Sequence, residues 1–421
     1  MQTFFCHNNQ VILKIKMETK IKNTAKSLFN KVPEVTLFFW VIKVLCTTVG
    51  ETFADFLNVN LGFGLSGTSI TMGLLLAIAL FIQFKSKKYV PAIYWISVVF
   101  ISVFGTLVTD NLTDMLGIRL EISTIIFSIL LFLTFAIWYF YEKTLSIHSI
   151  FTKRREVFYW ITILFTFALG TASGDLMAEG LGLGYLYTGI IVATLIVLVI
   201  VANKLKLNAV LSFWLIYIMT RPLGASIGDY LSQPTKFGGL GLGATSTSII
   251  FLIGIFAIIL YFTFTKRDII ACSDAGDKQN NEHNGLVFQS LITITLFIVF
   301  GVGAYNWRQS ELQKEISQQP KTSNLTNKNI VVSELGDLSK FKKITQDIKK
   351  LESADNLEGA INRVTDLEHE WDIAQAKLKP INSKKWMEVD DAIDKVLRKF
   401  RAVNPVQKDC LISLNALLKV L

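Results

Sequence analysis

The stretch WITILFTFALGTASGD, residues 160–175, determines how the rest of the chain is interpreted. It is apolar until its end, where Asp175 occupies a place at which a carboxylate is costly in hydrocarbon. The same pattern occurs four times: a tryptophan, a glycine ten residues later and an aspartate fifteen residues later. The four sets are Trp40, Gly50 and Asp55; Trp95, Gly105 and Asp110; Trp160, Gly170 and Asp175; and Trp214, Gly224 and Asp229. Four matches at one spacing predict an internal repeat.

Nine apolar segments are long enough to cross a hydrocarbon core of roughly 30 Å. They lie near 35–57, 66–84, 91–114, 122–142, 157–178, 185–203, 209–230, 247–265 and 286–305. The tryptophans are 55, 65 and 54 residues apart, which leaves room for two crossings per repeat. An even number of crossings makes the repeats parallel. The sequence therefore predicts an all-α, polytopic membrane helix bundle of four parallel two-helix repeats plus a ninth span.

The chain outside these spans divides by composition. Residues 308–335 are polar and rich in Asn, Gln and Ser, which is typical of a linker. An amphipathic helical pattern begins near Leu338, and Pro380 and Pro405 divide it into a predicted bundle of three or four helices. The predicted divisions are a basic leader at 1–33, a transmembrane domain at 34–306 with repeats near 34–88, 89–155, 156–207 and 208–267, a linker at 307–337 and a small helical domain at 338–421.

The basic residues indicate the orientation in the membrane. The net charge is +9, and the lysines and arginines cluster at every second membrane exit. These clusters are Lys20–Lys31, Lys85–Lys88, Lys143–Arg155, Lys204–Lys206 and Lys266–Arg267. The positive-inside rule then predicts a cytoplasmic N-terminus and, after nine crossings, an extracytoplasmic C-terminal domain in the cell (inner) membrane. The lipid bilayer is the predicted partner, nucleic acid is not, and the oligomeric state stays open.

Cofactor and enzyme signatures are weak. The four cysteines have no paired spacing and the four histidines fall outside the spans, so no disulfide framework and no cofactor is predicted. GTASGD is similar to the Gly-x-Gly-Asp motif of intramembrane aspartyl proteases. However, Ala172 takes the place of the first glycine and a second catalytic motif is missing. The sequence does not predict an enzyme.

The layout resembles a family of bacterial membrane-anchored proteins that consist of four tandem two-helix repeats of unknown function, each with a characteristic tryptophan. The resemblance rests on KVPEVTLFFWVIKVLCTTVGETFAD, GTLVTD, GTASGD and RPLGASIGD between Lys31 and Arg267. The C-terminal segments DLEHEWDIAQAKLKP and DDAIDKVLRKFRA are also similar to the tail of that family. The resemblance implies the fold and the membrane placement, and it implies no activity.

Two of the repeated positions have structural interpretations. Trp40, Trp95, Trp160 and Trp214 are predicted to anchor the helices at the cytoplasmic interface, as an aromatic belt. Another small residue follows each glycine by four positions, a spacing that lets two helices approach closely in lipid. Gly50, Gly105, Gly170 and Gly224 are therefore predicted to pack helices near the midplane, and a direct substrate role is the alternative. Lys43 is predicted to extend to the cytoplasmic interface.

The aspartates are candidates for a functional site. Asp55, Asp110, Asp175 and Asp229 are predicted to line an ion or substrate pathway together with Glu51 and Arg221. Glu51, Thr106 and Thr171 each precede an aspartate by four residues, on the same helix face. Arg221 is predicted to pair with a carboxylate, and Pro222 to kink its helix. The alternative is that the four aspartates are hydrated helix ends at the outer interface.

Two functions are compatible with this pattern. The first is a transporter or permease, in which carboxylates such as Glu51, Asp55 and Asp175 bind a divalent metal ion such as Mn²⁺, Mg²⁺ or Ca²⁺, or carry protons. The second is a membrane-anchored structural or sensor protein that displays the C-terminal domain. The sequence indicates neither the substrate nor the direction of transport.

Overall fold

The structure, a computed structural model, describes residues 30–61, 63–268, 285–318, 334–402 and 404–421. Within these residues, nine helices are long and apolar enough to cross a membrane, as predicted. The helices of repeats 1 to 4 are α2 (Leu37–Asp55) and α3 (Gly64–Lys85), α4 (Pro91–Asp110) and α5 (Leu120–Glu142), α6 (Lys153–Asp175) and α7 (Gly184–Lys204), and α8 (Ala209–Ser232) and α9 (Gly243–Thr265). The ninth spanning helix is α10 (Leu286–Gln318).

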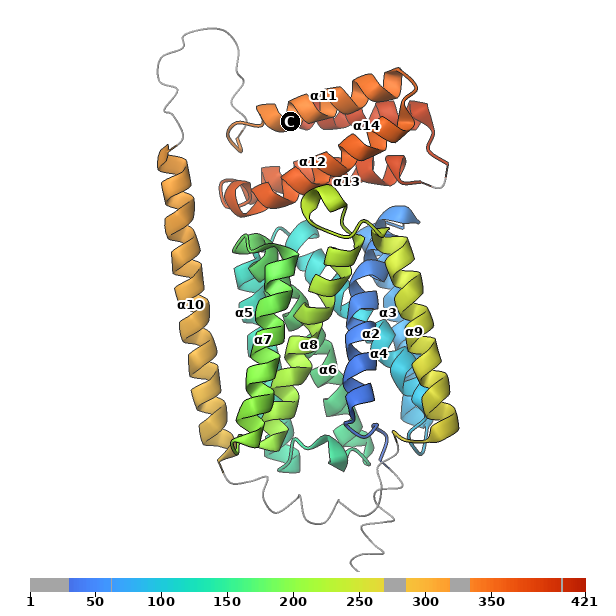
Figure 1. The fold of residues 1–421 in the computed structure, drawn as a ribbon, viewed down its shortest axis with the longest axis vertical. Coiled ribbons are helices and arrows are strands. Elements are labelled where there is room, and N and C mark those ends of the chain that lie inside the picture. The colour runs from blue at the N-terminus through green and yellow to red at the C-terminus, as the bar shows by residue number, and fades with distance from the viewer. Residues whose placement is uncertain (1–29, 62, 269–284, 319–333, 403) are drawn as a thin grey trace, which may run out of the picture.

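The first helices of the four repeats form a closed inner ring. Helix α2 packs against α4, α4 against α6, α6 against α8, and α8 against α2. More than half of the residues in each of these spans are buried, between 56% and 61%, whereas at most 28% are buried in the spans of α3, α5, α7 and α9. The second helices therefore lie on the outside of the ring (Figure 1).

Each outer helix packs on the inner helix of the following repeat. Helix α3 covers α4, α5 covers α6, α7 covers α8, and α9 returns to cover α2. Because the last repeat covers the first, all four repeats are needed to bury the inner helices.

Local sequence signals define where the inner helices begin. Thr36 and Thr152 accept hydrogen bonds from backbone amides in the first turns of α2 and α6, each at 3.3 Å. Asn208 caps α8 in the same way, with its Oδ1 3.0 Å from the amide of Val210. Helix α4 begins with Pro91, which lacks an N–H and is preorganised for a first helical turn.

The two ends of the bundle differ in charge. The loops that contain Lys85–Lys88, Lys143–Arg155 and Lys204–Lys206 lie at one end, close to the first described residues, and we call this the basic end. The C-terminal domain lies beyond the opposite end, which we call the domain end (Figure 1). The odd number of spanning helices accounts for this separation.

Three inner helices change their geometry at the repeated aspartate. Helices α2, α4 and α6 end at Asp55, Asp110 and Asp175, and each continues as one π-helical turn. These turns are η1 (Phe56–Asn60), η2 (Asn111–Met115) and η4 (Leu176–Gly180). Single π turns within helices are frequent at functional sites.

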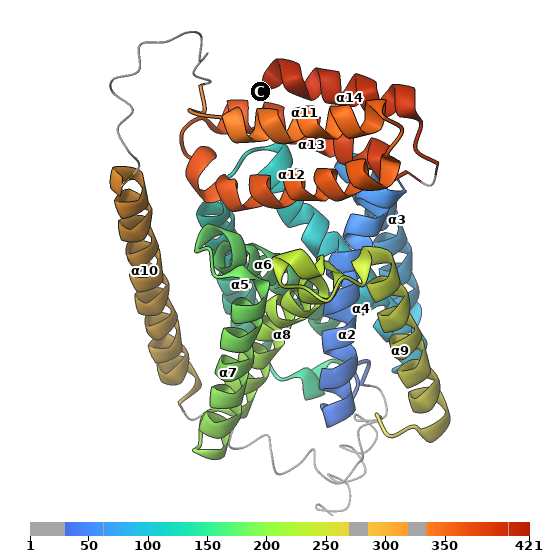
Figure 2. The ribbon, with the colours of Figure 1, turned by 45° about the horizontal axis from the view of Figure 1, so that its top comes forward.

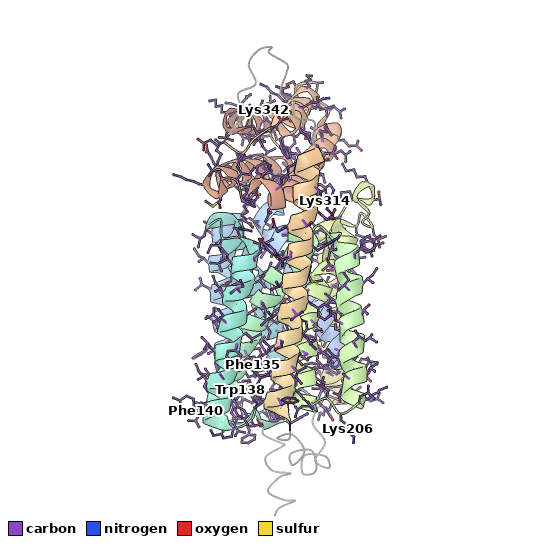
Figure 3. All side chains as sticks on the ribbon, turned by 90° about the vertical axis from the view of Figure 1, so that its left-hand side faces the viewer. Phe135, Trp138, Phe140, Lys206, Lys314 and Lys342 are labelled. Atoms are coloured by element: carbon purple, nitrogen blue, oxygen red, sulfur yellow. The ribbon has the colours of Figure 1, made fainter. Side chains whose placement is uncertain are left out.

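Helix α10 stands beside the bundle. None of the residues in its spanning window is buried, and the helix extends from the level of Lys206 at the basic end to Lys314 at the domain end (Figure 3). The predicted linker start at 307 is wrong, because α10 continues to Gln318. The stretch 307–318 contains no proline or glycine, and Glu311 and Lys314 pair at 2.6 Å one turn apart. The rest of the predicted linker, 319–333, lies outside the described residues.

The C-terminal domain contains four helices around a core of its own. They are α11 (Ser339–Ser353), α12 (Leu357–Leu378), α13 (Ser383–Phe400) and α14 (Gln407–Val420). Trp371 and Trp386 stack at the centre of this core with their ring centroids 5.7 Å apart. Pro380 and Pro405 lie in the connections between helices, where the sequence predicts breaks.

Candidate functional site: a polar axis inside the ring

The repeated glycines lie where neighbouring inner helices touch. An ideal Cβ at any of the four would lie between 1.9 and 2.8 Å from an atom of the next inner helix, which is closer than real Cβ atoms approach. In every case, the residue contacted lies three positions before the glycine of that next helix. The four contacts join Gly50 to Ser102, Gly105 to Phe167, Gly170 to Arg221 and Gly224 to Thr47. The ring therefore closes through one contact repeated four times.

Arg221 fills this contact position in the fourth repeat and is fully buried, with 0% of its surface exposed. Its guanidinium donates to all three other inner helices. Nη2 forms an ion pair with Oε2 of Glu51 at 2.5 Å and also bonds Oγ1 of Thr106. Nε donates to Oγ1 of Thr171, and Nη1 donates to the carbonyl of Thr47, each at 3.1 Å.

The repeat explains why these groups converge. Glu51, Thr106 and Thr171 occupy the same position in repeats 1 to 3, four residues before the aspartate, and Ala225 occupies it in repeat 4. In a closed ring of repeats, a position that faces the axis in one repeat faces it in every repeat. The first three inner helices therefore present oxygen atoms to the axis, and the fourth presents the guanidinium of Arg221 from one turn before Ala225. The carboxylate that pairs with Arg221 is thus Glu51. None of the four repeated aspartates forms an ion pair within the described residues.

The aspartates lie one turn closer to the domain end. Asp55 is exposed, and Asp110, Asp175 and Asp229 are half-buried. They are close enough to repel one another and Glu51 electrostatically. They therefore form a partly accessible acidic vestibule at the domain end of the ring, outward of Arg221.

Sequence reasoning missed two members of this vestibule. Asp114 in η2 and Glu179 in η4 interact electrostatically with the repeated aspartates. Each follows its aspartate by four residues, the spacing that places two side chains on one face of a helix. The spacing of four residues was therefore the sequence signal for these two carboxylates. The signal is present in only two repeats, because Val59 and Gln233 occupy the corresponding positions in repeats 1 and 4.

The structure does not bring together the metal ligands that the sequence predicts. In the part of the chain described, no three His, Cys, Asp or Glu side chains are grouped as a metal ion would require. Glu51 is bound by Arg221, and Asp55 and Asp175 extend from different helices of the ring. In this arrangement, Glu51, Asp55 and Asp175 are not a preassembled metal site.

The sequence predicts that the tryptophans anchor the helices at the cytoplasmic interface as an aromatic belt, but three of the four are buried inside the bundle. Trp95 is 0% exposed, and Trp160 and Trp214 are each 3% exposed. Trp40 is half-buried and packs on Phe213, with a centroid distance of 5.6 Å. In an isolated span these rings would face lipid, but closure of the ring turns this position inward. The tryptophans instead form an aromatic layer near the basic end.

Lys43 also lies inside the bundle, contrary to the prediction that it extends to the interface. It is 1% exposed, and its Nζ lies 3.7 Å from the centroid of the Phe167 ring and 4.2 Å from that of Tyr217. Aromatic faces attract ammonium groups. Lys43 is one helical turn before Thr47, so it lies between the aromatic layer and Arg221.

The basic end is closed by the chain that leads into α2. Lys31, the last basic residue of the predicted leader, is buried and pairs with Oε2 of Glu156 at 2.6 Å. Gln83 donates to the other oxygen of Glu156 at 3.2 Å. Deeper in the bundle, the hydroxyls of Tyr94 and Tyr159 are 2.5 Å apart. Residues 1–29 of the leader lie outside the described residues.

A ring of parallel two-helix repeats around a line of ionisable side chains defines a polytopic membrane protein built by internal repetition. The chain belongs to the family described as Repeat of Unknown Function (DUF347), whose model matches residues 38–89, 93–144, 158–205 and 212–268. Each match covers one inner helix and the outer helix that follows it. No curated protein and no solved structure matches the chain significantly.

Proposed function

We propose that the protein is a permease that moves protons, or a hard divalent cation, along the axis of the inner ring. The observation that carries the proposal is the ion pair of the fully buried Arg221 with the half-buried Glu51, together with the hydrogen bonds by which Arg221 connects all four inner helices. Ionisable groups within spanning segments are costly and commonly mark pathways for ions or protons.

Energetics favour this function over a purely structural one. Replacing a buried ion pair with well-packed apolar side chains is often neutral or stabilising. A bundle that only anchors a domain would thus lose nothing by carrying apolar side chains in place of both Arg221 and Glu51. The cost of burying Arg221 and Lys43 is explained if the axis exchanges charge.

The order of groups along the axis supports cations or protons as the substrate. The acidic vestibule concentrates cations near the domain end, because its four repeated aspartates, which have no ion partner among the described residues, produce a negative potential. Arg221 lies beyond the vestibule along the axis. Its positive charge repels cations, and the carboxylate of Glu51 neutralises that charge. A proton that binds Oε2 of Glu51 removes the ion pair and leaves Arg221 with its hydrogen bonds to Thr47, Thr106 and Thr171. Glu51 would thereby couple proton binding to the contacts between the inner helices.

Flux measurements test this proposal. Purified full-length protein in vesicles with a pH-sensitive dye inside should dissipate an imposed pH gradient, and Glu51→Gln should reduce that flux at least tenfold. Parallel vesicles with a metal-sensitive dye test Mn²⁺, Mg²⁺ and Ca²⁺. Glu311→Gln on the exposed part of α10 is the matched control and should leave flux unchanged. If protons and all three metals fail to cross, the permease proposal is wrong.

Asp175→Asn should reduce the same flux, and the double variant with Glu51→Gln should abolish it. Both variants should still insert, because an uncharged amide is less costly in hydrocarbon than a carboxylate. Unchanged abundance together with unchanged flux in the double variant would contradict a role for the vestibule.

The second candidate function is that of an anchor or sensor. The separate core of the C-terminal domain favours it, because a domain with its own apolar core does not need the ring to fold. It becomes the better interpretation if no ion crosses the membrane in the flux measurements.

The orientation has a test of its own. By the positive-inside rule, the basic loops support a cytoplasmic position for the basic end. A reporter fused after Leu421 should therefore be active outside the cytoplasm, and a reporter fused at Asp268 should be active inside it. The reverse result would contradict the assignment of the basic end to the cytoplasm.

A further inference from the structure

We propose that the C-terminal domain is a proton-operated lid that docks reversibly on the domain end of the ring, over the acidic vestibule. Figure 2 shows α12 and α13 lying across this end. The inference rests on the contacts and charges between the domain and the ring. It does not depend on the proposed transport function.

The domain reaches all four repeats. In repeat 1, Arg398 approaches Gly64, and α13 packs against η1. In repeat 2, the hydroxyl of Ser383 donates to the carbonyl of Gly117 at 2.8 Å. In repeat 3, α12 packs against η4. In repeat 4, Nζ of Lys236 lies 2.5 Å from Oδ1 of Asp366. Contacts with every repeat place the domain over the mouth of the ring rather than at its side.

The side-chain hydrogen bonds and ion pairs among these contacts are few, and the thioether of Met387 in α13 lies beside Gly117. The apolar core of the domain and the apolar core of the ring are separate clusters. The ion pair of Lys236 with Asp366 is partly exposed, with 40% of the lysine side chain and 25% of the aspartate side chain accessible to solvent. Exposed ion pairs contribute roughly 0–1 kcal/mol each to stability. Lys379 approaches Asp114 only to 3.9 Å. An interface without a shared apolar core is weak enough to open while both parts stay folded.

Carboxylates face one another across this interface. From the ring, they are Asp55, Asp110, Asp114, Asp175, Glu179 and Asp229. From the domain, they are Glu368, Asp372, Asp390 and Asp394. The bases that face them are Lys236, Lys379, Arg398 and Arg401, and His369 and Tyr185 are the other titratable groups nearby. Because carboxylates outnumber bases, full ionisation opposes docking.

Proton binding favours the docked state. Burial, together with neighbouring carboxylates, raises the pKa of Asp372 and Asp390, and burial raises the pKa of Asp394 to about 6. A group whose pKa is higher when docked takes up a proton on docking. It stabilises the docked state at low pH, and this contribution is lost as the pH rises through the docked pKa. Burial lowers the pKa of Lys379 and of His369, and these two groups act in the opposite direction.

Distances between spin labels test the lid in the full-length protein. Labels at Met115→Cys in the ring and Lys384→Cys in the domain, with Cys6 and Cys272 replaced by serine, should give one short distance at pH 5. A population at longer distance should appear above about pH 6. Each linked proton changes the ratio of the two populations by up to about tenfold per pH unit. A distance distribution that is the same at pH 5 and pH 8 would overturn the proposal.

Two controls separate opening from unfolding and from general charge effects. A label pair inside the domain, Lys350→Cys with Glu388→Cys, should keep one distance at both pH values. Asp372→Asn with Asp394→Asn should keep the lid docked at pH 8, because neither amide ionises. Asp391→Asn, on the solvent face of α13 with 62% of the side chain exposed, should open like the wild type. If Asp391→Asn has the same effect as the double variant, the facing carboxylates do not control docking.

Discussion

Replacing Arg221 with alanine is expected to remove most of the folded protein from the membrane. The change leaves Glu51 as an uncompensated charge inside the ring. It also removes the hydrogen bonds that the guanidinium donates to Thr47, Thr106 and Thr171. Breaking a buried pair by removing one partner costs about 3–5 kcal/mol, and single domains are stable by only about 5–15 kcal/mol. The measurement is the folded fraction after mild detergent extraction, as a function of temperature.

A double variant makes this prediction specific to the charge. Arg221→Met with Glu51→Leu removes both charges and keeps most of the volume, so it should recover a large part of the stability. It should still carry no flux if the axis is the pathway. Arg154→Ala is the matched control, since Arg154 pairs with Glu142 at the basic end with 65% of its side chain exposed and should change stability by less than about 1 kcal/mol. Equal stability of Arg221→Ala and Arg154→Ala would show that Arg221 does not connect the ring.

Gly224→Leu is expected to have the second largest effect. An ideal Cβ at residue 224 lies 1.9 Å from Oγ1 of Thr47, 2.6 Å from its Cβ and 3.0 Å from the backbone nitrogen of Thr48. Rotating the Thr47 side chain cannot relieve contact with backbone, so α2 and α8 must separate. Overpacking a core typically costs 1–3 kcal/mol and here also opens the seam between the fourth repeat and the first, so we expect a loss on the order of 3 kcal/mol. Gly170→Leu should act similarly at Arg221.

The control for the glycine variants is on the ninth spanning helix. No atom of the residues that the structure describes lies within 4 Å of a Cβ added at Gly301 of α10, so Gly301→Leu introduces the same side chain into a spanning helix without a collision among them. Thermal stability of the solubilised protein, monitored by aggregation, compares the variants. If Gly301→Leu is as destabilising as Gly224→Leu, the effect comes from the leucine itself and not from the contact between α2 and α8.

The pattern of tryptophan, glycine and aspartate was sufficient to predict the four repeats, and the apolar segments were sufficient to predict the nine spans. Both depend on local quantities, namely the length of apolar segments and the period of the repeat. Part of the site was predictable in the same way. The i, i+4 spacing places Glu51 and Asp55 on one helix face, and an arginine next to Pro222 in an apolar span stands out in the sequence. The partner of Arg221 could not be chosen among the available carboxylates, because that depends on how α8 lies relative to α2.

Two assignments failed because they depend on which side of a helix faces lipid. Trp95 and Lys43 follow general rules for spanning helices, an aromatic belt and a lysine that extends to the interface. Both residues are inside the bundle because the inner helices close into a ring. A single helix does not record which of its faces will meet another repeat.

By itself, the sequence determined the number of spanning helices, their parallel repetition and the cost of each intramembrane charge, because hydrophobicity and chain length act residue by residue. Only the tertiary structure decided that Arg221 binds Glu51, that three of the four repeated tryptophans are buried and that the C-terminal domain covers the acidic vestibule. These features come from contacts between segments that are distant in the chain, such as Arg221 with Glu51 and Ser383 with Gly117. Close packing permits such contacts only in the one arrangement in which every inner helix fits its neighbours.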